Sequence, residues 1–204
     1  MPIDCAFFSC TGLTSVTIPD SVTSIGEDAF SECYALKEIH YNGDLIGWLN
    51  ISGLSNLMAK GQSTKSLYID GAKVEGDLVI PDVVTSISSF ALSGCNELSS
   101  VTIGSGVTSI GDYAFYKCSG LKSVTIGNSV ISIGSSAFEY CSGLTNVTIP
   151  DSVTSIGSRV FYWCSGLKRI DFNGTKAQWE AIEKGGNWCP YAGDFTVYCT
   201  DGTI

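Results

Sequence analysis

The chain has 204 residues, of which 44% are hydrophobic and 15% charged, a balance that indicates a globular protein and excludes a disordered one. Its formal net charge of −9 disfavours nucleic acid and anionic lipid as partners, because both need clustered lysine and arginine. No apolar run reaches the roughly 18 residues that a membrane-spanning helix requires, so we expect no membrane insertion.

The first residues of the chain already match a later unit. Ala6-Phe7 corresponds to Ala29-Phe30. We therefore expect the N-terminal residues to lie inside a repeat. Either they continue from a longer protein, which we favour, or they form a degenerate first unit that serves as a cap.

A period of 23 residues organises most of the chain, and both leucines and cysteines recur at this spacing. The leucines are Leu13 and Leu36, then Leu98, Leu121, Leu144 and Leu167. The cysteines are Cys10 and Cys33, then Cys95, Cys118, Cys141 and Cys164. A fixed period of about 20 to 29 residues with an L-x-x-L-x-L-like pattern predicts a leucine-rich-repeat solenoid, in which each unit packs only on its neighbours.

One unit, residues 121–143, shows how each turn is expected to fold. Residues 121–126 predict a short strand with apolar residues at its first, fourth and sixth positions, and residues 130–134 predict a second extended segment rich in β-branched side chains. Residues 135–141 fit one or two helical turns, with Ala137, Phe138 and Cys141 facing inward. We therefore expect a strand-rich α+β solenoid with parallel ladders. Its outward strand positions are mostly small hydroxyls, and a solvated face is favoured there over a ligand platform.

Six of the nine cysteines occupy one repeat position, where each can stack on the next as a small apolar side chain. Parallel side chains in register rarely reach the torsion of about 90° that a disulfide needs. We predict that all six are reduced and buried. Cys5, Cys189 and Cys199 lie outside this column, and Cys189 with Cys199 is the only disulfide we consider.

Two inserts interrupt the period, and they resemble each other. Tyr41-Asn42-Gly43 followed by Trp48 matches Phe172-Asn173-Gly174 followed by Trp179, always 131 residues later. Asp70-Gly71 matches Asp201-Gly202 at the same offset. Each insert predicts an Asn-Gly turn, a short helix, a loop and a strand that ends at an Asp-Gly turn.

The helices of the two inserts have separate start and stop patterns. Asp44 is the predicted N-cap of the first helix. In the second, Thr175 and Gln178 have capping-box spacing, Glu180 and Lys184 are predicted to pair, and Gly185-Gly186 is predicted to end the helix.

The two insert tryptophans have two interpretations. In the favoured one, Trp48 and Trp179 are core residues that cover the end of the preceding repeats. In the other, each tryptophan lines a groove together with Tyr41 or Phe172, where an amphipathic ring could meet a sugar or a peptide.

The unit L-x-x-V-x-I-P-x-S-V-T-S-I-G-x-x-A-F-x-x-C-x-x, at residues 13–35 and 144–166, closely resembles the BspA-type leucine-rich repeats of bacterial surface proteins. The resemblance covers residues 5 to about 170. It implies an extracellular or cell-surface location, and some members resemble adhesins for host matrix proteins or other cells. It supplies no shared catalytic or binding residues.

We interpret residues 1–204 as a single leucine-rich-repeat domain. Residues 1–35 form the N-terminal repeats, 36–74 the first insert, 75–166 the central repeats and 167–204 the C-terminal insert. His40 is the only histidine, which excludes motifs that need two, such as H-E-x-x-H. We expect no enzyme activity, no metal and no cofactor.

The function we expect is a non-catalytic cell-surface module that binds protein or glycan on host or neighbouring cells. The alternatives are a passive spacer within a larger surface protein and a unit that stacks end to end. A binding site is predicted where each strand ladder meets an insert, because charge and an aromatic anchor coincide there. The residues of this site are Lys37, Glu38, His40 and Tyr41 at the first junction, and Lys168, Arg169, Asp171 and Phe172 at the second. The alternative there is an ordinary charged rim.

Overall fold

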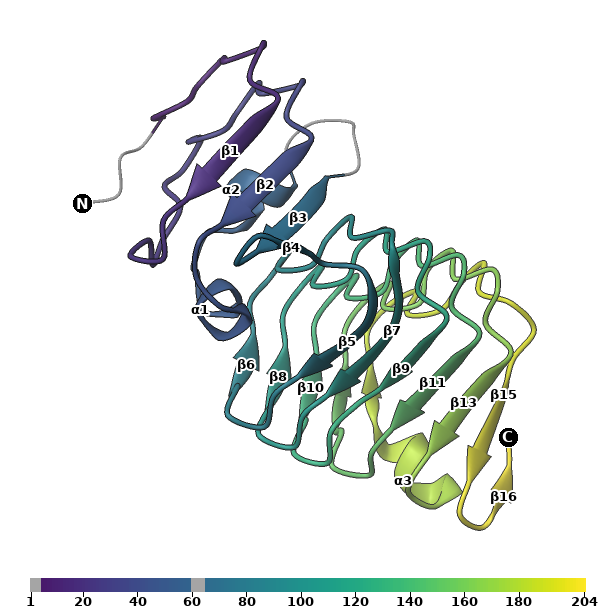
Figure 1. Ribbon diagram of the computed structural model, residues 1–204. Coiled ribbons are helices and arrows are strands. Elements are labelled where there is room, and N and C mark those ends of the chain that lie inside the picture. Colours follow the sequence, from purple (N-terminus) through teal and green to yellow (C-terminus); the bar gives the residue numbers. More distant parts are fainter. Residues whose placement is uncertain (1–4, 60–64) are drawn as a thin grey trace.

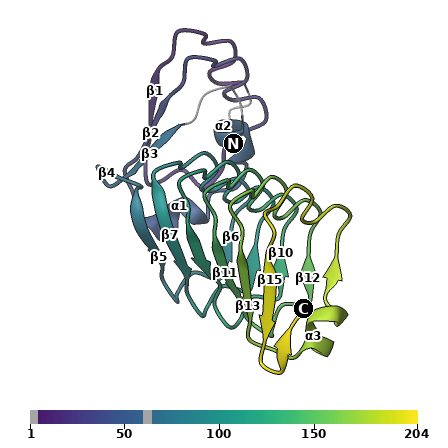
Figure 2. The ribbon, with the colours of Figure 1, turned by 90° about the vertical axis from the view of Figure 1, so that its right-hand side faces the viewer.

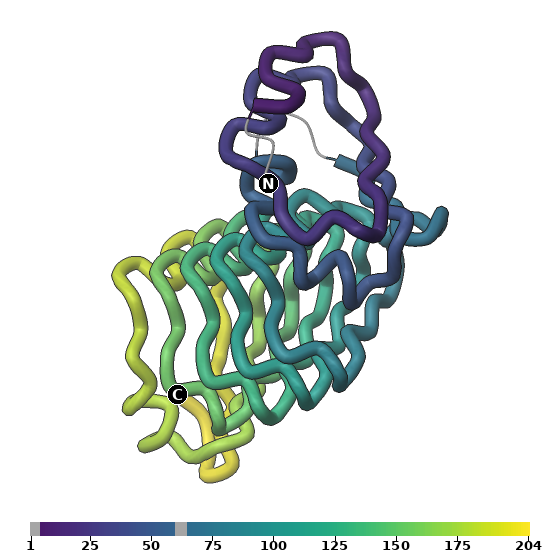
Figure 3. The backbone as a smooth tube through the Cα atoms, turned by 90° about the vertical axis from the view of Figure 1, so that its left-hand side faces the viewer, coloured from purple at the N-terminus to yellow at the C-terminus, as the bar shows by residue number. Residues whose placement is uncertain are grey.

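The computed structural model describes residues 5–59 and 65–204, and it is a strand-rich solenoid built from two stacks of turns (Figure 1). The first stack contains residues up to Lys73, and the second begins at Gly76. Figure 3 shows the turns as coils that follow one another along an axis, with the first stack at one end of the second. The predicted solenoid is confirmed.

The first stack has one four-stranded sheet. Its strands are β1 (Ser15–Ile18), β2 (Glu38–Tyr41), β3 (Ser66–Ile69) and β4 (Ala72–Lys73). The first three are parallel, and β4 returns antiparallel to β3. Asp70 and Gly71 form the turn between β3 and β4 with φ of 47° and 75°, the left-handed values that a tight hairpin requires.

The second stack has two sheets, which lie on different sides of the solenoid (Figure 2). The seven-stranded sheet contains β5 (Gly76–Ile80), β7 (Leu98–Ile103), β9 (Ser123–Thr125), β11 (Asn146–Ile149), β13 (Arg169–Phe172), β15 (Thr196–Cys199) and β16 (Gly202–Thr203). The five-stranded sheet contains β6 (Ser86–Ile87), β8 (Ser109–Ile110), β10 (Ser132–Ile133), β12 (Ser155–Ile156) and β14 (Glu183–Lys184). All pairs are parallel except β15 with β16.

The register of the strands follows the 23-residue period. Val101 pairs with Val124, Val124 with Val147, and Val147 with Ile170. All four side chains are buried, so each turn contributes the same apolar position to a continuous core. The parallel ladders are therefore confirmed.

The third side of each turn is not helical, and the predicted helix over residues 135–141 is wrong. Ser136 and Tyr140 have left-handed backbone, with φ of 57° and 61°. The N–H groups of Ser136, Phe138 and Tyr140 donate to the next turn, whereas those of the alternate residues close local turns. A helix would keep all its N–H bonds within the segment, so the bonds between turns exclude it. The predicted inward residues Ala137, Phe138 and Cys141 are buried, as expected.

The three helices of the described residues all lie in the inserts. They are α1 (Leu45–Leu49), α2 (Ser55–Met58) and α3 (Lys176–Ala181). The Asp44 carboxylate accepts the Gly47 N–H at 2.7 Å, which confirms this N-cap. Thr175 and Gln178 form the predicted capping box at the start of α3.

The end of α3 differs from the prediction. The helix stops at Ala181, before Gly185-Gly186, because Glu183 and Lys184 join the five-stranded sheet as β14. Lys184 lies outside the helix, and its ammonium donates to the carbonyl oxygens of Trp179 and Ile182. The predicted ion pair with Glu180 is therefore absent.

Each insert closes a parallel sheet with an antiparallel strand, β4 in the first and β16 in the second. Such a return strand covers an edge whose N–H and C=O groups would otherwise lie unpaired. In the second insert Cys199 pairs with Gly202, so Thr200 and Asp201 form the turn. The hairpin is thus one residue earlier than the predicted Asp201-Gly202.

The cysteine column is free of disulfides, and five of its six members are buried. The thiols of Cys118, Cys141 and Cys164 donate to carbonyl oxygens 26 residues earlier, at 3.1, 3.1 and 3.0 Å. Cys10 is exposed, so the prediction that all six are buried is wrong at this position. Residues 5–13 form only part of a turn, and no turn among the described residues stacks over Cys10.

Candidate functional site

The two aromatic residues of the predicted junction site lie in the core. Tyr41 and Phe172 are each 2% exposed, because they occupy inward positions at the ends of β2 and β13. Each ring contacts the tryptophan of its own insert, Tyr41 with Trp48 at 5.6 Å and Phe172 with Trp179 at 5.3 Å between ring centroids. Both tryptophans are also buried, which confirms the core interpretation and removes the groove.

The charged residues of the first junction are at the surface. Lys37 and Glu38 are exposed, and His40 is half-buried. The His40 ring stacks on Tyr68 at 4.5 Å, and its Nε2 lies 3.5 Å from a Glu38 carboxylate oxygen. The aromatic ring on this outward face is therefore Tyr68 of β3, in place of the predicted Tyr41.

The second junction has the same arrangement. Lys168 and Arg169 are exposed, and Asp171 is half-buried. The Arg169 guanidinium binds the Asp171 carboxylate, with both oxygens 2.8 Å from its Nε, and lies 3.9 Å from the centre of the Tyr198 ring. Tyr68 and Tyr198 were missed because the sequence places them a full insert away from the charged residues. The strand pairing brings His40 beside Tyr68 and Asp171 beside Tyr198.

A larger aromatic surface lies on the turn-rich side of the second stack, which sequence analysis had assigned to short helices. We call it the turn-face aromatic patch. It consists of Tyr113, Tyr116, Lys117, Tyr140, Arg159, Tyr162, Trp163 and Tyr191. Trp163 is 44% and Tyr191 is 64% exposed, which is unusual for large aromatic side chains.

The rings of the patch contact one another from turn to turn. Tyr140 stacks on Trp163 with an interplanar angle of 14°, and Trp163 stacks on Tyr191 with centroids 5.1 Å apart. Tyr162 stands at 85° to both Tyr140 and Tyr191 and fills the space beside this column. The backbone beneath is fixed by hydrogen bonds between turns, such as Tyr140 N–H to Tyr162 O at 2.9 Å. The rings are therefore held in a preset arrangement.

Two cations belong to the patch. The Lys117 ammonium lies 5.1 Å from the centre of the Tyr116 ring, and the Arg159 guanidinium lies 5.3 Å from that of Tyr162. Neither forms an ion pair with a carboxylate in residues 5–59 or 65–204. Burial and the nearby Glu139 carboxylate raise the pKa of Tyr116, so its hydroxyl remains a hydrogen-bond donor at neutral pH.

The sequence contains a pattern that could have located the patch. The residue before each cysteine of the column occupies one outward position, and in three successive turns this residue is Lys117, Tyr140 and Trp163. A comparison of this outward position between successive turns indicates an aromatic column.

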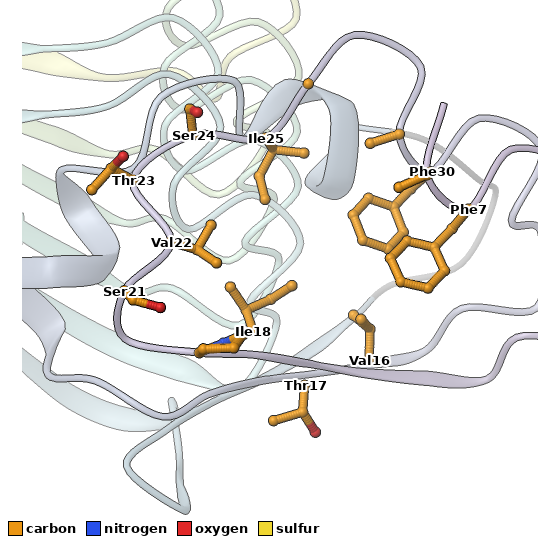
Figure 4. Close-up of a pocket in the computed structure, with 14 residues that line it drawn as sticks. Phe7, Val16, Thr17, Ile18, Ser21, Val22, Thr23, Ser24, Ile25 and Phe30 are labelled. Carbon is orange, nitrogen blue, oxygen red and sulfur yellow. The ribbon is translucent and has the colours of Figure 1, made fainter. Parts of the chain in front are cut away.

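A cavity of about 480 Å³ lies at the N-terminal end of the first stack (Figure 4). Val16, Ile18, Val22 and Ile25 point into it from the two sides of the first turn, and the stacked rings of Phe7 and Phe30 close one end. None of the described residues that line it is charged. It is continuous with the apolar core, because Val16, Ile18, Ala29 and Phe30 belong to both.

The described part of the chain contains no group of three His, Cys, Asp or Glu side chains placed to hold a metal ion. Within the same residues, none of the three helices has the length and apolar character of a membrane span.

Comparison with known families identifies the repeat. Six copies of the BspA type leucine rich repeat region match residues 3–49 and 73–182. The chain belongs to this family. Apart from residues 1–2, the unmatched residues are the later parts of the two inserts, which depart from the repeat.

Solved bacterial structures resemble the chain of this BspA-type protein. A leucine rich cell surface protein from Faecalibacterium prausnitzii is 28% identical with a TM-score of 0.50, over 84% of this chain and 51% of that one. A leucine-rich repeat protein from Bacteroides ovatus is 24% identical with a TM-score of 0.52, over 97% and 58%. One from Eubacterium ventriosum is 22% identical with a TM-score of 0.54, over 94% and 67%. The last two show the fold alone.

The chain thus spans between half and three-fifths of the length of the first two of these structures. No curated protein sequence matches it significantly.

Proposed function

We propose that this BspA-type protein is a non-catalytic interaction module of a bacterial cell surface and binds protein or glycan through the turn-face aromatic patch. The surface location is supported by family membership and by the cell surface protein of Faecalibacterium prausnitzii that it resembles. The patch is the observation that supports binding.

The fold does not require aromatic residues at these outward positions. Gly94 and Glu32 occupy the position of Tyr140 in other turns, and Ser93 occupies that of Tyr162. The same backbone therefore forms with small or charged side chains. Exposed clusters of tryptophan, tyrosine and arginine are typical of binding surfaces, where these residues contribute most of the binding energy.

The two strand-ladder junctions are a second candidate site, supported by the outward rings of Tyr68 and Tyr198 beside charged residues. Arg169 with Tyr198 is the pair to replace there. Phe172 is buried, so its replacement would test stability instead of binding.

Two structural observations favour other functions. The burial of Trp48 and Trp179 removes the predicted grooves and is compatible with a passive spacer. The apolar cavity beside β1 is compatible with end-to-end association, in which a second copy packs against its apolar lining. Sedimentation analysis across a range of protein concentrations tests association directly.

The test of the proposed function is a binding screen against purified matrix proteins and glycans. Trp163→Ala with Tyr191→Ala removes the most exposed rings, Arg169→Ala with Tyr198→Ala alters the second junction, and Thr102→Ala with Thr125→Ala is the control on the strand face. Loss of binding in the first variant alone supports the proposal, and loss in the second alone moves the site to the junction. If the native protein binds no matrix protein or glycan with a Kd below about 1 mM, the proposed binding function is wrong and the spacer function replaces it.

A further inference from the structure

The turn-face aromatic patch repeats along the solenoid axis. Lys117, Tyr140 and Trp163 occupy one position in successive turns, and Tyr116, Glu139 and Tyr162 occupy a neighbouring one. Backbone hydrogen bonds of 2.8 to 2.9 Å join these turns, at Lys117 N–H to Glu139 O and at Tyr140 N–H to Tyr162 O. The spacing is therefore that of hydrogen-bonded strands, about 4.8 Å. A surface that repeats along one axis suits a ligand that is itself a repeating polymer.

The patch lies outside both cavities described here, which bears on the class of ligand. Its residues line neither the N-terminal cavity nor the small cavity between the stacks around Lys73 and Glu97. Protein partners usually insert anchor side chains into well-packed pockets. A polysaccharide instead needs apolar ring surface beside hydrogen-bond donors, and tyrosine and tryptophan provide both.

The charge of the patch selects among polysaccharides. Lys117 and Arg159 have no carboxylate partner among the described residues, whereas the three ion pairs found there lie elsewhere. Glu139, in the turn between those of Lys117 and Arg159, is buried. A guanidinium and an ammonium at a surface are the usual ligands of carboxylate groups. The charges that make up the net charge of −9 lie mostly farther from a ligand on the patch than these two cations do. Salt screens such distant charges over about 10 Å at 0.1 M, so Lys117 and Arg159 dominate the attraction.

We propose that the turn-face aromatic patch binds an acidic polysaccharide whose chain lies along the solenoid axis. The sugar rings pack against Tyr140, Trp163 and Tyr191, and carboxylate groups of the polymer pair with Lys117 and Arg159. This inference rests on the proposed function and specifies the ligand class at the same site.

Isothermal titration calorimetry with purified oligosaccharides of polygalacturonate, hyaluronan and polysialic acid tests the proposal. The matched ligand is the methyl-esterified oligogalacturonate, which keeps the backbone and loses the charges. We expect the native protein to bind at least one acidic oligosaccharide at least tenfold more tightly than its neutral form. Raising the salt concentration should weaken this binding.

Three variants assign the binding to the patch. Lys117→Gln with Arg159→Gln should abolish the preference for the acidic ligand, and Trp163→Ala with Tyr191→Ala should weaken binding at least tenfold. Glu139→Gln should strengthen binding of the acidic ligand and leave the neutral one unchanged. Thr102→Ala with Thr125→Ala on the strand face should have no effect, and circular dichroism checks that each variant folds.

The outcomes separate this inference from the proposed function. Equal binding of the acidic and neutral ligands, or a preference for the acidic ligand that survives the loss of both cations, overturns the proposal of an acidic ligand. The proposed interaction module is not affected by this outcome. Binding of a matrix protein through the patch, with no oligosaccharide bound, also overturns the acidic polysaccharide as ligand and supports the interaction module. Binding of an acidic oligosaccharide that the patch variants do not change places the site elsewhere and overturns the inference. Absence of any ligand in both screens overturns both proposals.

Discussion

The indole Nε1 of Trp48 donates a 2.7 Å hydrogen bond to the carbonyl oxygen of Ala91, 43 residues further along the chain. The hydroxyl of Ser88 donates in the opposite direction, to the carbonyl oxygen of Leu49 at 2.6 Å. Because Trp48 and Leu49 belong to the first insert and Ala91 to the second stack, these two bonds join the stacks. The first insert therefore connects them in addition to closing its own sheet.

Trp48→Phe should destabilise the protein more than Trp179→Phe. Both tryptophans are buried and both changes remove the same volume, but within the described residues only Trp48 uses its indole N–H in a hydrogen bond. Leaving the buried Ala91 carbonyl unpaired costs about 1–3 kcal/mol. Urea unfolding followed by circular dichroism measures the difference, and equal losses in the two variants would show that the bond contributes nothing.

Trp179→Ala should lower the free energy of unfolding by about 3–5 kcal/mol, the usual range for truncating a buried aromatic residue. The ring contacts Phe172 and Trp188, so its loss leaves a void in the C-terminal insert. Trp163→Ala is the matched control and should cost less, because Trp163 is 44% exposed whereas Trp179 is buried. A loss below about 1 kcal/mol for Trp179→Ala would contradict its place in the core.

The sequence predicted the inward positions well and the outward positions poorly, for a physical reason. Inward residues such as Val124 and Cys141 must pack on their equivalents one turn away, so the 23-residue period preserves their type. Outward residues have no such constraint, and their neighbours come from other turns. The pairing of Arg169 with Tyr198 depends on the strand register across the second insert. That register depends on the number of insert residues that lie between β13 and β15. The local sequence pattern does not specify this number.

The turn-rich side was the main error in secondary structure. Ala137, Phe138 and Cys141 have helical spacing, and the same spacing also arises when left-handed residues alternate with local turns. Left-handed backbone at Ser136 and Tyr140 costs each residue about 1–3 kcal/mol. The hydrogen bonds to the next turn offset this cost, and a single unit considered alone does not contain them.

Gly143→Ala should destabilise the solenoid. A Cβ at Gly143 would lie 2.4 Å from the carbonyl oxygen of Ser119 in the preceding turn, a backbone atom that has little freedom to move. Overpacking of this kind costs about 1–3 kcal/mol or more. Gly186→Ala is the control, because nothing lies within 4 Å of its Cβ position. Thermal unfolding of the two variants should show a lower Tm for Gly143→Ala only, and an unchanged Tm would refute the close approach.

Thiol labelling of the native protein should separate the cysteines into groups. Cys5 and Cys10 are exposed and should react fast, and the half-buried Cys189 and Cys199 should react more slowly. The five buried thiols should react only after unfolding, since burial raises their pKa and suppresses the thiolate. Mass spectrometry of timed samples identifies each site, and fast labelling of any buried thiol would contradict the packing.

The buried thiols should also make the protein less stable in alkali. Burial raises the pKa of Cys95 and of Cys164 to about 12 and that of Cys141 well above its usual value, whereas an unfolded thiol has a pKa of about 8.5. Below pH 8.5 both states keep the proton, and the stabilisation is complete. As the pH rises, the unfolded chain loses its protons first, so the free energy of unfolding falls until the folded pKa is reached.

Each of these three thiols should therefore remove about 2 kcal/mol between pH 8 and pH 10. Cys141→Ala should reduce the slope of the free energy of unfolding against pH by the contribution of one buried thiol. Cys10→Ala changes an exposed residue and should leave this slope unchanged. The raised pKa values of Tyr41 and Tyr116 act in the same direction and are common to all variants. Urea unfolding at several pH values gives the slopes. If Cys141→Ala and the native protein lose stability in parallel, the Cys141 thiol is not buried in its neutral form.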